Sequence, residues 1–208
     1  MKVLVICAKQ YNGHELWTAL GIMQRRGIEF EVVSTQREIK DEISFQPNII
    51  DRTVGDLLPN EMFDFDGIMI VSGNMKDTEA YWRDERVLNQ IRMADQMGKA
   101  IAAICCSVPT IREVAKGKRV SFFPLIRSRM LLEEAGAVLT TVAVSVDGRL
   151  VTAEHQMATQ LWATAFSNIL EGKPDGVNLV DSGFTPKGRE RKPIKEIEAL
   201  KGIKKLPT

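Results

Sequence analysis

The sequence has few cysteines and no long apolar run, and each shortage excludes a class of protein. Three cysteines, two of them adjacent, cannot form a disulfide framework in a chain of 208 residues. No segment approaches the ~18 apolar residues of a membrane-spanning helix. The apolar run after Met1 turns polar at Lys9, so it is too short for the core of a signal peptide. We therefore expect a cytoplasmic protein with no membrane partner.

The chain also lacks an excess of either charge. Its 28 Lys and Arg residues nearly balance 27 Asp and Glu residues, which leaves a net charge of +1. This balance gives no reason to expect a nucleic-acid partner. There are only two histidines, and we find neither a glycine-rich phosphate loop nor a cluster with metal-ligand spacing. We expect no cofactor and no metal.

What the chain does contain is a regular alternation of apolar strand-like runs and helical stretches. The expected strands occupy 2–8, 30–34, 67–71 and 100–104, and the expected helices occupy 14–26, 84–97, 109–115, 130–135 and 156–170. A short edge strand is expected at 48–51. Strands at 139–146 and 150–152 flank Asp147-Gly148, a dipeptide typical of a two-residue hairpin turn.

This alternation predicts an α/β fold with an open, mostly parallel sheet and helices on both faces. Ligands of such sheets bind beyond the carboxyl ends of the strands. Three loops should meet there, at 10–15, 72–75 and 105–108. Trp17 and Trp162 lie at core-like spacing on two of the expected helices.

The composition changes after about residue 172. Residues 186–208 contain eight Lys and Arg residues against three Glu residues, a local charge of +5. We therefore divide the chain into an α/β domain at 1–172 and a basic C-terminal extension at 173–208.

The most informative segment is the end of the apolar run 100–104, where Cys105 follows directly. A strand that ends in a nucleophile and turns sharply into a helix is a nucleophile elbow, which requires small residues two positions before and after the nucleophile. Ala103 and Ser107 satisfy this for Cys105, whereas Cys106 would be flanked by two branched residues. A helix N-terminus lowers the pKa of a nearby thiol. Position alone equally allows Cys105 to be a small buried apolar residue.

Several segments, in order, resemble the ThiJ/PfpI family of the class I glutamine amidotransferase-like superfamily. The similarity covers roughly residues 1–172. It rests on the first strand with its following glutamate, on Ala-Ala-Ile-Cys with Pro109 beyond it, and on the segments 65–74, 123–124, 135–137 and 146–152. The resemblance implies a flavodoxin-like three-layer sandwich and a homodimer or higher homo-oligomer.

The resemblance also implies partners for Cys105. In this family a glutamate from the first loop hydrogen-bonds the cysteine sulfur, and Glu15 stands at the matching position. Gly73 and Cys106 would offer their backbone N–H groups as an oxyanion hole. Ser72 stands where the family usually has another glycine. An ordinary helix-start glutamate and a plain glycine turn are the structural alternatives for Glu15 and Gly73.

One departure from the family weakens a peptidase function. Protease-like members have a histidine directly after the cysteine, where this chain has Cys106. His14 and His155 are the only possible bases, although a surface histidine is the commoner role for each. Members with glyoxalase or deglycase activity often use a histidine where this chain has Phe123.

Three functions follow from these observations. The first is a cysteine-dependent enzyme that acts on a small reactive carbonyl substrate, as glyoxalase and deglycase relatives do. The second is a redox sensor or stress chaperone that uses oxidation of Cys105. The third is an intracellular cysteine peptidase.

Overall fold

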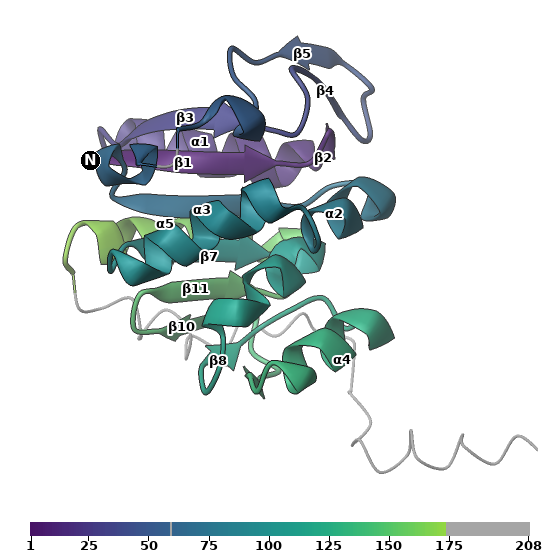
Figure 1. Cartoon of the computed structure of the whole chain (residues 1–208), viewed down its shortest axis with the longest axis vertical. Helices are drawn as coiled ribbons and strands as arrows, with labels where there is room; N and C mark the ends of the chain where they lie inside the picture. The colour runs from purple at the N-terminus through teal and green to yellow at the C-terminus, as the bar shows by residue number, and fades with distance from the viewer. Residues whose placement is uncertain (59, 174–208) are drawn as a thin grey trace, which may run out of the picture.

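The computed structural model describes residues 1–58 and 60–173, so the predicted extension at 173–208 lies outside the described residues but for its first position. Its centre is a six-stranded sheet in the order β10-β11-β7-β6-β1-β3 (Figure 1). All neighbouring strands are parallel except the pair β10 and β11. The strands are β1 (Lys2–Cys7), β3 (Glu29–Val33), β6 (Gly67–Val71), β7 (Ala100–Ile104), β10 (Val144–Asp147) and β11 (Leu150–Ala153).

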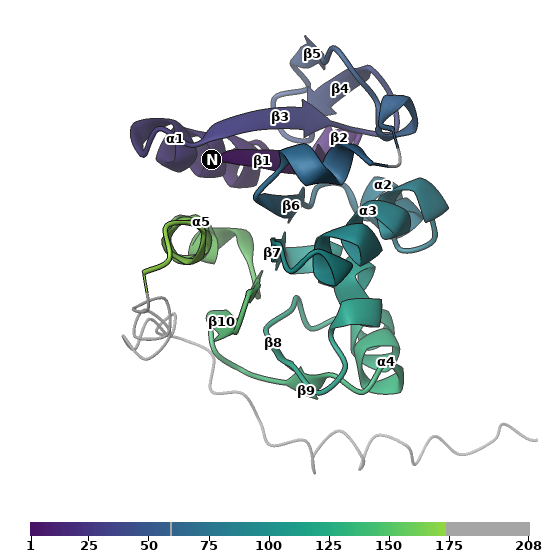
Figure 2. The same cartoon turned by 60° about the vertical axis from the view of Figure 1, so that its left-hand side comes forward.

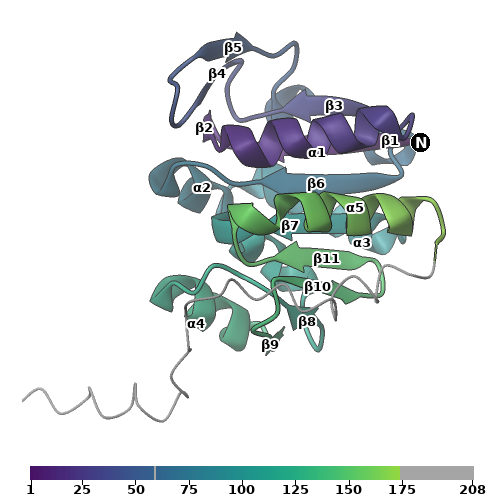
Figure 3. The same cartoon turned by 180° about the vertical axis from the view of Figure 1, so that it is seen from behind.

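Helices cover both faces of this sheet and make three layers. Helices α1 (Gly13–Arg25) and α5 (Thr159–Leu170) lie side by side on one face, and α3 (Glu85–Gln96) lies on the other (Figures 2 and 3). Every residue of β6 and β7 is buried, as expected for parallel strands covered on both sides. The predicted α/β sandwich with a mostly parallel sheet is confirmed.

Each face of the sheet has its own apolar core because successive side chains of a strand point to opposite faces. Val3, Val5 and Cys7 belong to the core beneath α1 and α5. Leu4 and Ile6 belong to the core beneath α3. Trp162 is fully buried in the first core, as its spacing predicts.

Trp17 contradicts its prediction, since it is 53% exposed. Its ring lies edge-on to Tyr11, with the centroids 6.1 Å apart. Tyr11 belongs to a small second sheet, formed by β2 (Gln10–Tyr11), β4 (Glu38–Asp41) and β5 (Pro47–Ile49). This small sheet lies beyond the end of the main sheet at the top of Figure 1. The expected edge strand at 48–51 is therefore β5, and it pairs with β4 instead of with the main sheet.

Other predicted bounds also need correction. The strand expected at 139–146 is two separate strands, β9 (Val138–Leu139), which pairs with β8 (Arg119–Val120), and β10. The helix expected from 156 begins as a 3-10 turn, η4 (Gln156–Ala158), before α5. The helix expected at 130–135 is longer, α4 (Ile126–Glu134). Helix α2 (Met75–Tyr81) was not predicted.

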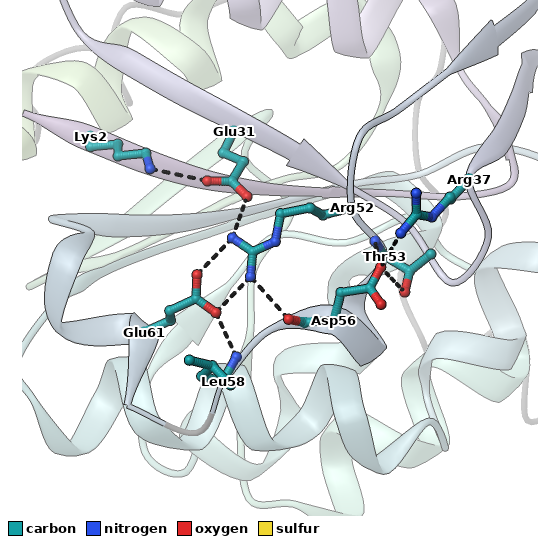
Figure 4. Close-up of polar contacts among 8 residues, drawn as sticks. All are labelled: Lys2, Glu31, Arg37, Arg52, Thr53, Asp56, Leu58 and Glu61. Carbon is teal, nitrogen blue, oxygen red and sulfur yellow. Dashed lines mark hydrogen bonds and ion pairs between the residues drawn. The ribbon is translucent and has the colours of Figure 1, made fainter.

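A charged network holds the connection between β3 and β6 against the sheet. Arg52 donates to Glu31 of β3 at 3.0 Å, and through both terminal nitrogens to the two carboxylate oxygens of Glu61 at 2.6 Å (Figure 4). It also donates to the backbone oxygen of Asp56 at 3.0 Å. Glu61 belongs to η2 (Glu61–Asp64) and Asp56 to η1 (Val54–Asp56), so a single guanidinium joins three segments.

Replacing Arg52 with lysine is expected to destabilise the fold by about 1 kcal/mol, because an ammonium group cannot make the two-pronged contact. The loss should shrink in high salt, which screens charge pairs. Arg37→Lys is the control, because Arg37 is 63% exposed and meets Asp56 only at 3.4 Å. It should change stability by less than about 0.5 kcal/mol. Urea unfolding at low and high salt measures both, and equal effects of the two variants would contradict the role of the network.

Candidate active site

The three loops that were expected to meet do so at the carboxyl ends of β1, β6 and β7. The Asn12 N–H donates to the Ser72 carbonyl at 2.9 Å, and this contact joins the first loop to the second. The Ser72 N–H donates to Glu15 at 2.9 Å. The Ser107 hydroxyl donates to the Ile70 carbonyl at 2.9 Å, and this contact joins the third loop to the end of β6.

The elbow has the strained backbone that its sequence predicts. Cys105 has a φ of 58°, in the left-handed region that costs a non-glycine residue about 1–2 kcal/mol. Ser107 stabilises the turn from inside. Its hydroxyl accepts from the Ile104 N–H at 3.1 Å and lies within hydrogen-bonding distance of the Ile70 and Ile104 carbonyls. The small residue two positions after the nucleophile thus ties the elbow to β6. The helix that follows is a 3-10 helix, η3 (Cys105–Val114).

Glu15 is a completely buried carboxyl group. Its place is fixed because Asn12 caps α1 by accepting from the Glu15 N–H at 3.0 Å. One carboxyl oxygen, Oε2, accepts from both the N–H and the hydroxyl of Ser72, at 2.9 and 2.7 Å. The other oxygen, Oε1, is buried and has no hydrogen-bond partner among the residues that the structure describes. Oε1 is therefore the oxygen of Glu15 whose hydrogen-bonding capacity is unused.

Burial raises the pKa of Glu15 well above its usual range, and the nearby Cys105 raises it further, although the two Ser72 contacts lower it. A carboxyl group with this pKa retains its proton under conditions where an exposed glutamate has lost it. Glu15 therefore differs from the structural alternative, an exposed and ionised glutamate at the start of a helix.

The pKa of the Cys105 thiol is raised, whereas its place at a helix N-terminus predicted a lowered pKa. The hydrogen bond with the Cys106 sulfur and burial raise its pKa, against Ser72 and the Cys106 N–H, which lower it. The Cys106 N–H thus lowers the thiol pKa, as a donor there is expected to do, but the Cys106 sulfur and burial outweigh it. Cys105 rests as a thiol, and its reaction requires a group that takes its proton. Its side chain is still half-buried and not enclosed, unlike that of Cys7.

The two predicted oxyanion-hole donors have different surroundings. The Cys106 N–H points to the Cys105 sulfur, where it lowers the thiol pKa. The Gly73 N–H donates to the Thr78 hydroxyl at 3.1 Å. A substrate oxygen would have to replace Thr78 to use Gly73, so the two donors stay a prediction.

Neither histidine hydrogen-bonds the Cys105 sulfur within the described chain. His14 is exposed on the first turn of α1. His155 accepts from the Met157 N–H at 3.3 Å through Nδ1, and its ring lies 5.7 Å from that of Phe123. Phe123 in turn contacts the elbow, because its N–H donates to the Cys105 carbonyl at 3.5 Å. His155 is thus linked to the elbow through Phe123.

Three residues outside the predicted set of site residues also shape the site. Ser72 contacts both Glu15 and Cys105 through its hydroxyl. Thr78 engages the Gly73 N–H. Trp82 donates from its indole nitrogen to the Cys106 carbonyl at 3.0 Å. The signal for Ser72 was present in the sequence, since a polar residue there replaces the family's glycine.

Three further findings concern a metal site, a second hollow and membrane-spanning helices. No group of three or more His, Cys, Asp and Glu side chains in residues 1–58 and 60–173 is arranged to hold a metal ion. A separate hollow of about 140 Å³ lies at the opposite, amino end of β7, between Asp95 and Arg149. Its charged groups already pair with each other, at 3.5 Å for Lys118 with Asp147 and 3.9 Å for Arg149 with Asp95. Among the helices that are described, none has the length and apolar character needed to cross a membrane.

Comparisons with known proteins identify the family. Residues 1–168 match the DJ-1/PfpI family. An uncharacterized protein of Methanocaldococcus jannaschii is 25% identical over 171 residues, which cover 81% of this chain and 82% of the relative.

Solved structures share the fold. A ThiJ/PfpI domain protein of Brachyspira murdochii has a TM-score of 0.74 at 18% identity, over 82% of this chain and 96% of that one. Drosophila melanogaster DJ-1beta has a TM-score of 0.69 at 22% identity, over 88% of this chain and 96% of that one. The fold, the elbow and the match over residues 1–168 lead to one conclusion: this chain belongs to the DJ-1/PfpI family.

Proposed function

We propose that the protein is a cysteine-dependent enzyme that acts on small reactive carbonyl compounds such as 2-oxoaldehydes, with Cys105 as the nucleophile and Glu15 as its proton-transfer partner. The observation that carries the proposal is the pairing of a thiol on a strained elbow with a carboxyl group that is fully buried and raised in pKa. Titratable groups with strongly shifted pKa values gather at catalytic sites.

The first step begins from the uncharged Cys105 thiol and the protonated Glu15 carboxyl group. The Cys105 sulfur forms a bond to the aldehyde carbon of methylglyoxal while the carbonyl oxygen takes a proton from Glu15. The thiol proton returns to Glu15 through the Ser72 hydroxyl, which contacts both groups. The product is a hemithioacetal, and no net charge has been created in a buried site.

The remaining steps move protons and consume one water molecule. Glu15 donates its proton to the ketone oxygen and takes one from the former aldehyde carbon, which gives a neutral enediol. It then protonates the ketone carbon and takes the proton of the former aldehyde oxygen, which leaves a lactoyl thioester on Cys105 and Glu15 protonated as before. Water then hydrolyses the thioester to lactate and restores the thiol. This sequence needs neither an oxidant nor a cofactor.

Lactate formation from methylglyoxal tests the proposal. Cys105→Ala should lower kcat/KM by about 10³-fold or more, because the nucleophile is lost. Cys7→Ala is the matched control. Cys7 is a fully buried thiol whose pKa burial raises to about 12, and it should leave the turnover unchanged.

Absence of turnover by the wild-type protein at every pH tested would overturn the proposal.

The second candidate, a redox sensor, is favoured by the half-buried Cys105 thiol with its two hydrogen-bond donors. If the protein is a redox sensor, mild peroxide should add oxygen to the Cys105 sulfur of the wild-type protein even though that protein does not turn over the carbonyl substrate. The peptidase function has less support, because neither imidazole contacts the sulfur within the described residues.

A further inference from the structure

The two adjacent thiols at the elbow are close enough to act together. The Sγ atoms of Cys105 and Cys106 lie 3.6 Å apart, and both cysteines are free. Of these two thiols, the carbonyl chemistry proposed above uses the Cys105 sulfur alone. The Cys106 sulfur is a soft ligand for which that chemistry gives no role.

The distance between the two sulfurs is closer to that of two sulfurs bonded to one common atom than to that of a disulfide bond. A disulfide requires about 2.05 Å between the sulfurs. Two thiolates on one tetrahedral centre, each bonded at about 2.3 Å, lie about 3.8 Å apart. Trivalent arsenic forms bonds to sulfur of similar length at somewhat narrower angles. The observed 3.6 Å therefore fits chelation with little movement of either side chain.

The charge of the two bound sulfurs distinguishes a metal ion from an uncharged centre as the atom that they share. A divalent metal ion requires both thiols to ionise, and two thiolates side by side in a buried site repel each other. No third metal-ligating side chain completes a cluster among the residues that the structure describes. A monosubstituted trivalent arsenical is neutral and needs two sulfurs and no further ligand from the protein.

We propose that Cys105 and Cys106 form a chelating site for monosubstituted trivalent arsenicals, R–As(OH)₂. Each thiol condenses with one As–OH group, so two As–S bonds form, two As–O bonds break and two water molecules leave. The oxidation states of arsenic and sulfur do not change. The product is a neutral ring that contains both sulfurs.

The order of the two steps follows from exposure. The Cys105 side chain is half-buried, whereas Cys106 is only 6% exposed. The first As–S bond therefore forms at Cys105, and the second closes on the neighbouring sulfur. The held separation of the two thiols makes the second step intramolecular, which typically strengthens binding about 10²–10⁴-fold.

Phenylarsine oxide, which hydrates to the required acid, is the probe. One equivalent added to the protein, reduced beforehand with a phosphine, should give a one-to-one adduct by intact mass. The adduct should survive excess 2-mercaptoethanol and be removed by 2,3-dimercaptopropanol. Cys106→Ser and Cys105→Ser should each weaken the retained binding about 100-fold or more. Cys7→Ser should bind like the wild type.

Protection of the wild-type thiols keeps the test valid if a variant fails to fold. After arsenical treatment, unfolding and alkylation should label Cys7 and spare Cys105 and Cys106. A wild-type adduct that monothiol removes, or a Cys106→Ser adduct that resists it, would overturn the proposal. Alkylation of Cys106 in the treated protein would do the same. None of these readouts depends on carbonyl turnover.

Discussion

Glu15→Gln is expected to slow turnover strongly and to make the folded protein more stable at alkaline pH. Glutamine keeps the shape of the protonated carboxyl group and can still accept the two Ser72 hydrogen bonds through its oxygen. It cannot exchange a proton with Cys105. We expect kcat to fall about 10²–10⁴-fold, which is the usual contribution of a general acid–base group.

The stability effect has a defined dependence on pH. The pKa of Glu15 is raised in the folded state, whereas the unfolded chain has an ordinary carboxyl pKa. From that ordinary value upward the folded state binds more protons than the unfolded state, so the wild type loses stability as pH rises. Glutamine removes this loss. The gain should reach about 1–2 kcal/mol at pH 8, the size of an unsatisfied buried polar group, and vanish below the ordinary carboxyl range.

Urea unfolding across this pH range measures the effect. Glu38→Gln is the control for loss of one negative charge, because Glu38 is exposed, and its stability should follow the wild-type curve. A constant difference between Glu15→Gln and wild type at all pH values would show that Glu15 is not held protonated.

Gly73→Ala is expected to destabilise the protein by about 3 kcal/mol or more, which is beyond the usual cost of a point mutation. A Cβ atom at this position would lie 1.9 Å from the Gln10 carbonyl oxygen and 2.6 Å from the Tyr11 Cα. Both are backbone atoms and cannot rotate away. The first two loops are also hydrogen-bonded at this point, since the Asn74 N–H donates to the Gln10 carbonyl at 2.7 Å.

Gly21→Ala is the matched control. Gly21 lies inside α1, where the nearest obstacle to a Cβ atom is the end of the Arg25 side chain at 3.5 Å. Alanine there should stabilise the protein by about 1 kcal/mol, the usual difference in helix propensity. A tolerated Gly73→Ala in urea unfolding would contradict the packing described between the first two loops.

The parallel strands could be predicted because their sequences are nearly continuous apolar runs. Those of 67–71 and 100–104 match β6 and β7 residue for residue. Small residues on both sides of Cys105 also predicted the sharp turn there, which its φ of 58° confirms. Gly73 has no positive φ, and it is the close backbone approach of the first loop that excludes a side chain there.

Apart from the edge strand expected at 48–51, the small sheet could not be predicted, since its strands have only two to four residues each and depend on contacts distant in sequence. Asn48, for example, is fixed by its donation to the Tyr11 hydroxyl at 2.7 Å. The raised pKa of Cys105 was missed for a similar reason. The helix-terminus argument is local, whereas burial and the approach of the Cys106 sulfur arise only in the folded chain.

The central claim is that Glu15 and Cys105 form one proton-sharing unit, and the pH dependence of Cys105 alkylation tests it most directly. Iodoacetamide reacts with the thiolate, so its rate follows ionisation of the thiol. Glu15→Gln removes a carboxylate that repels the thiolate at high pH, and its amide can donate to the sulfur. The midpoint of the rate profile should therefore move to clearly lower pH than in the wild type. An unchanged midpoint would show that the two groups do not interact, and would contradict the account.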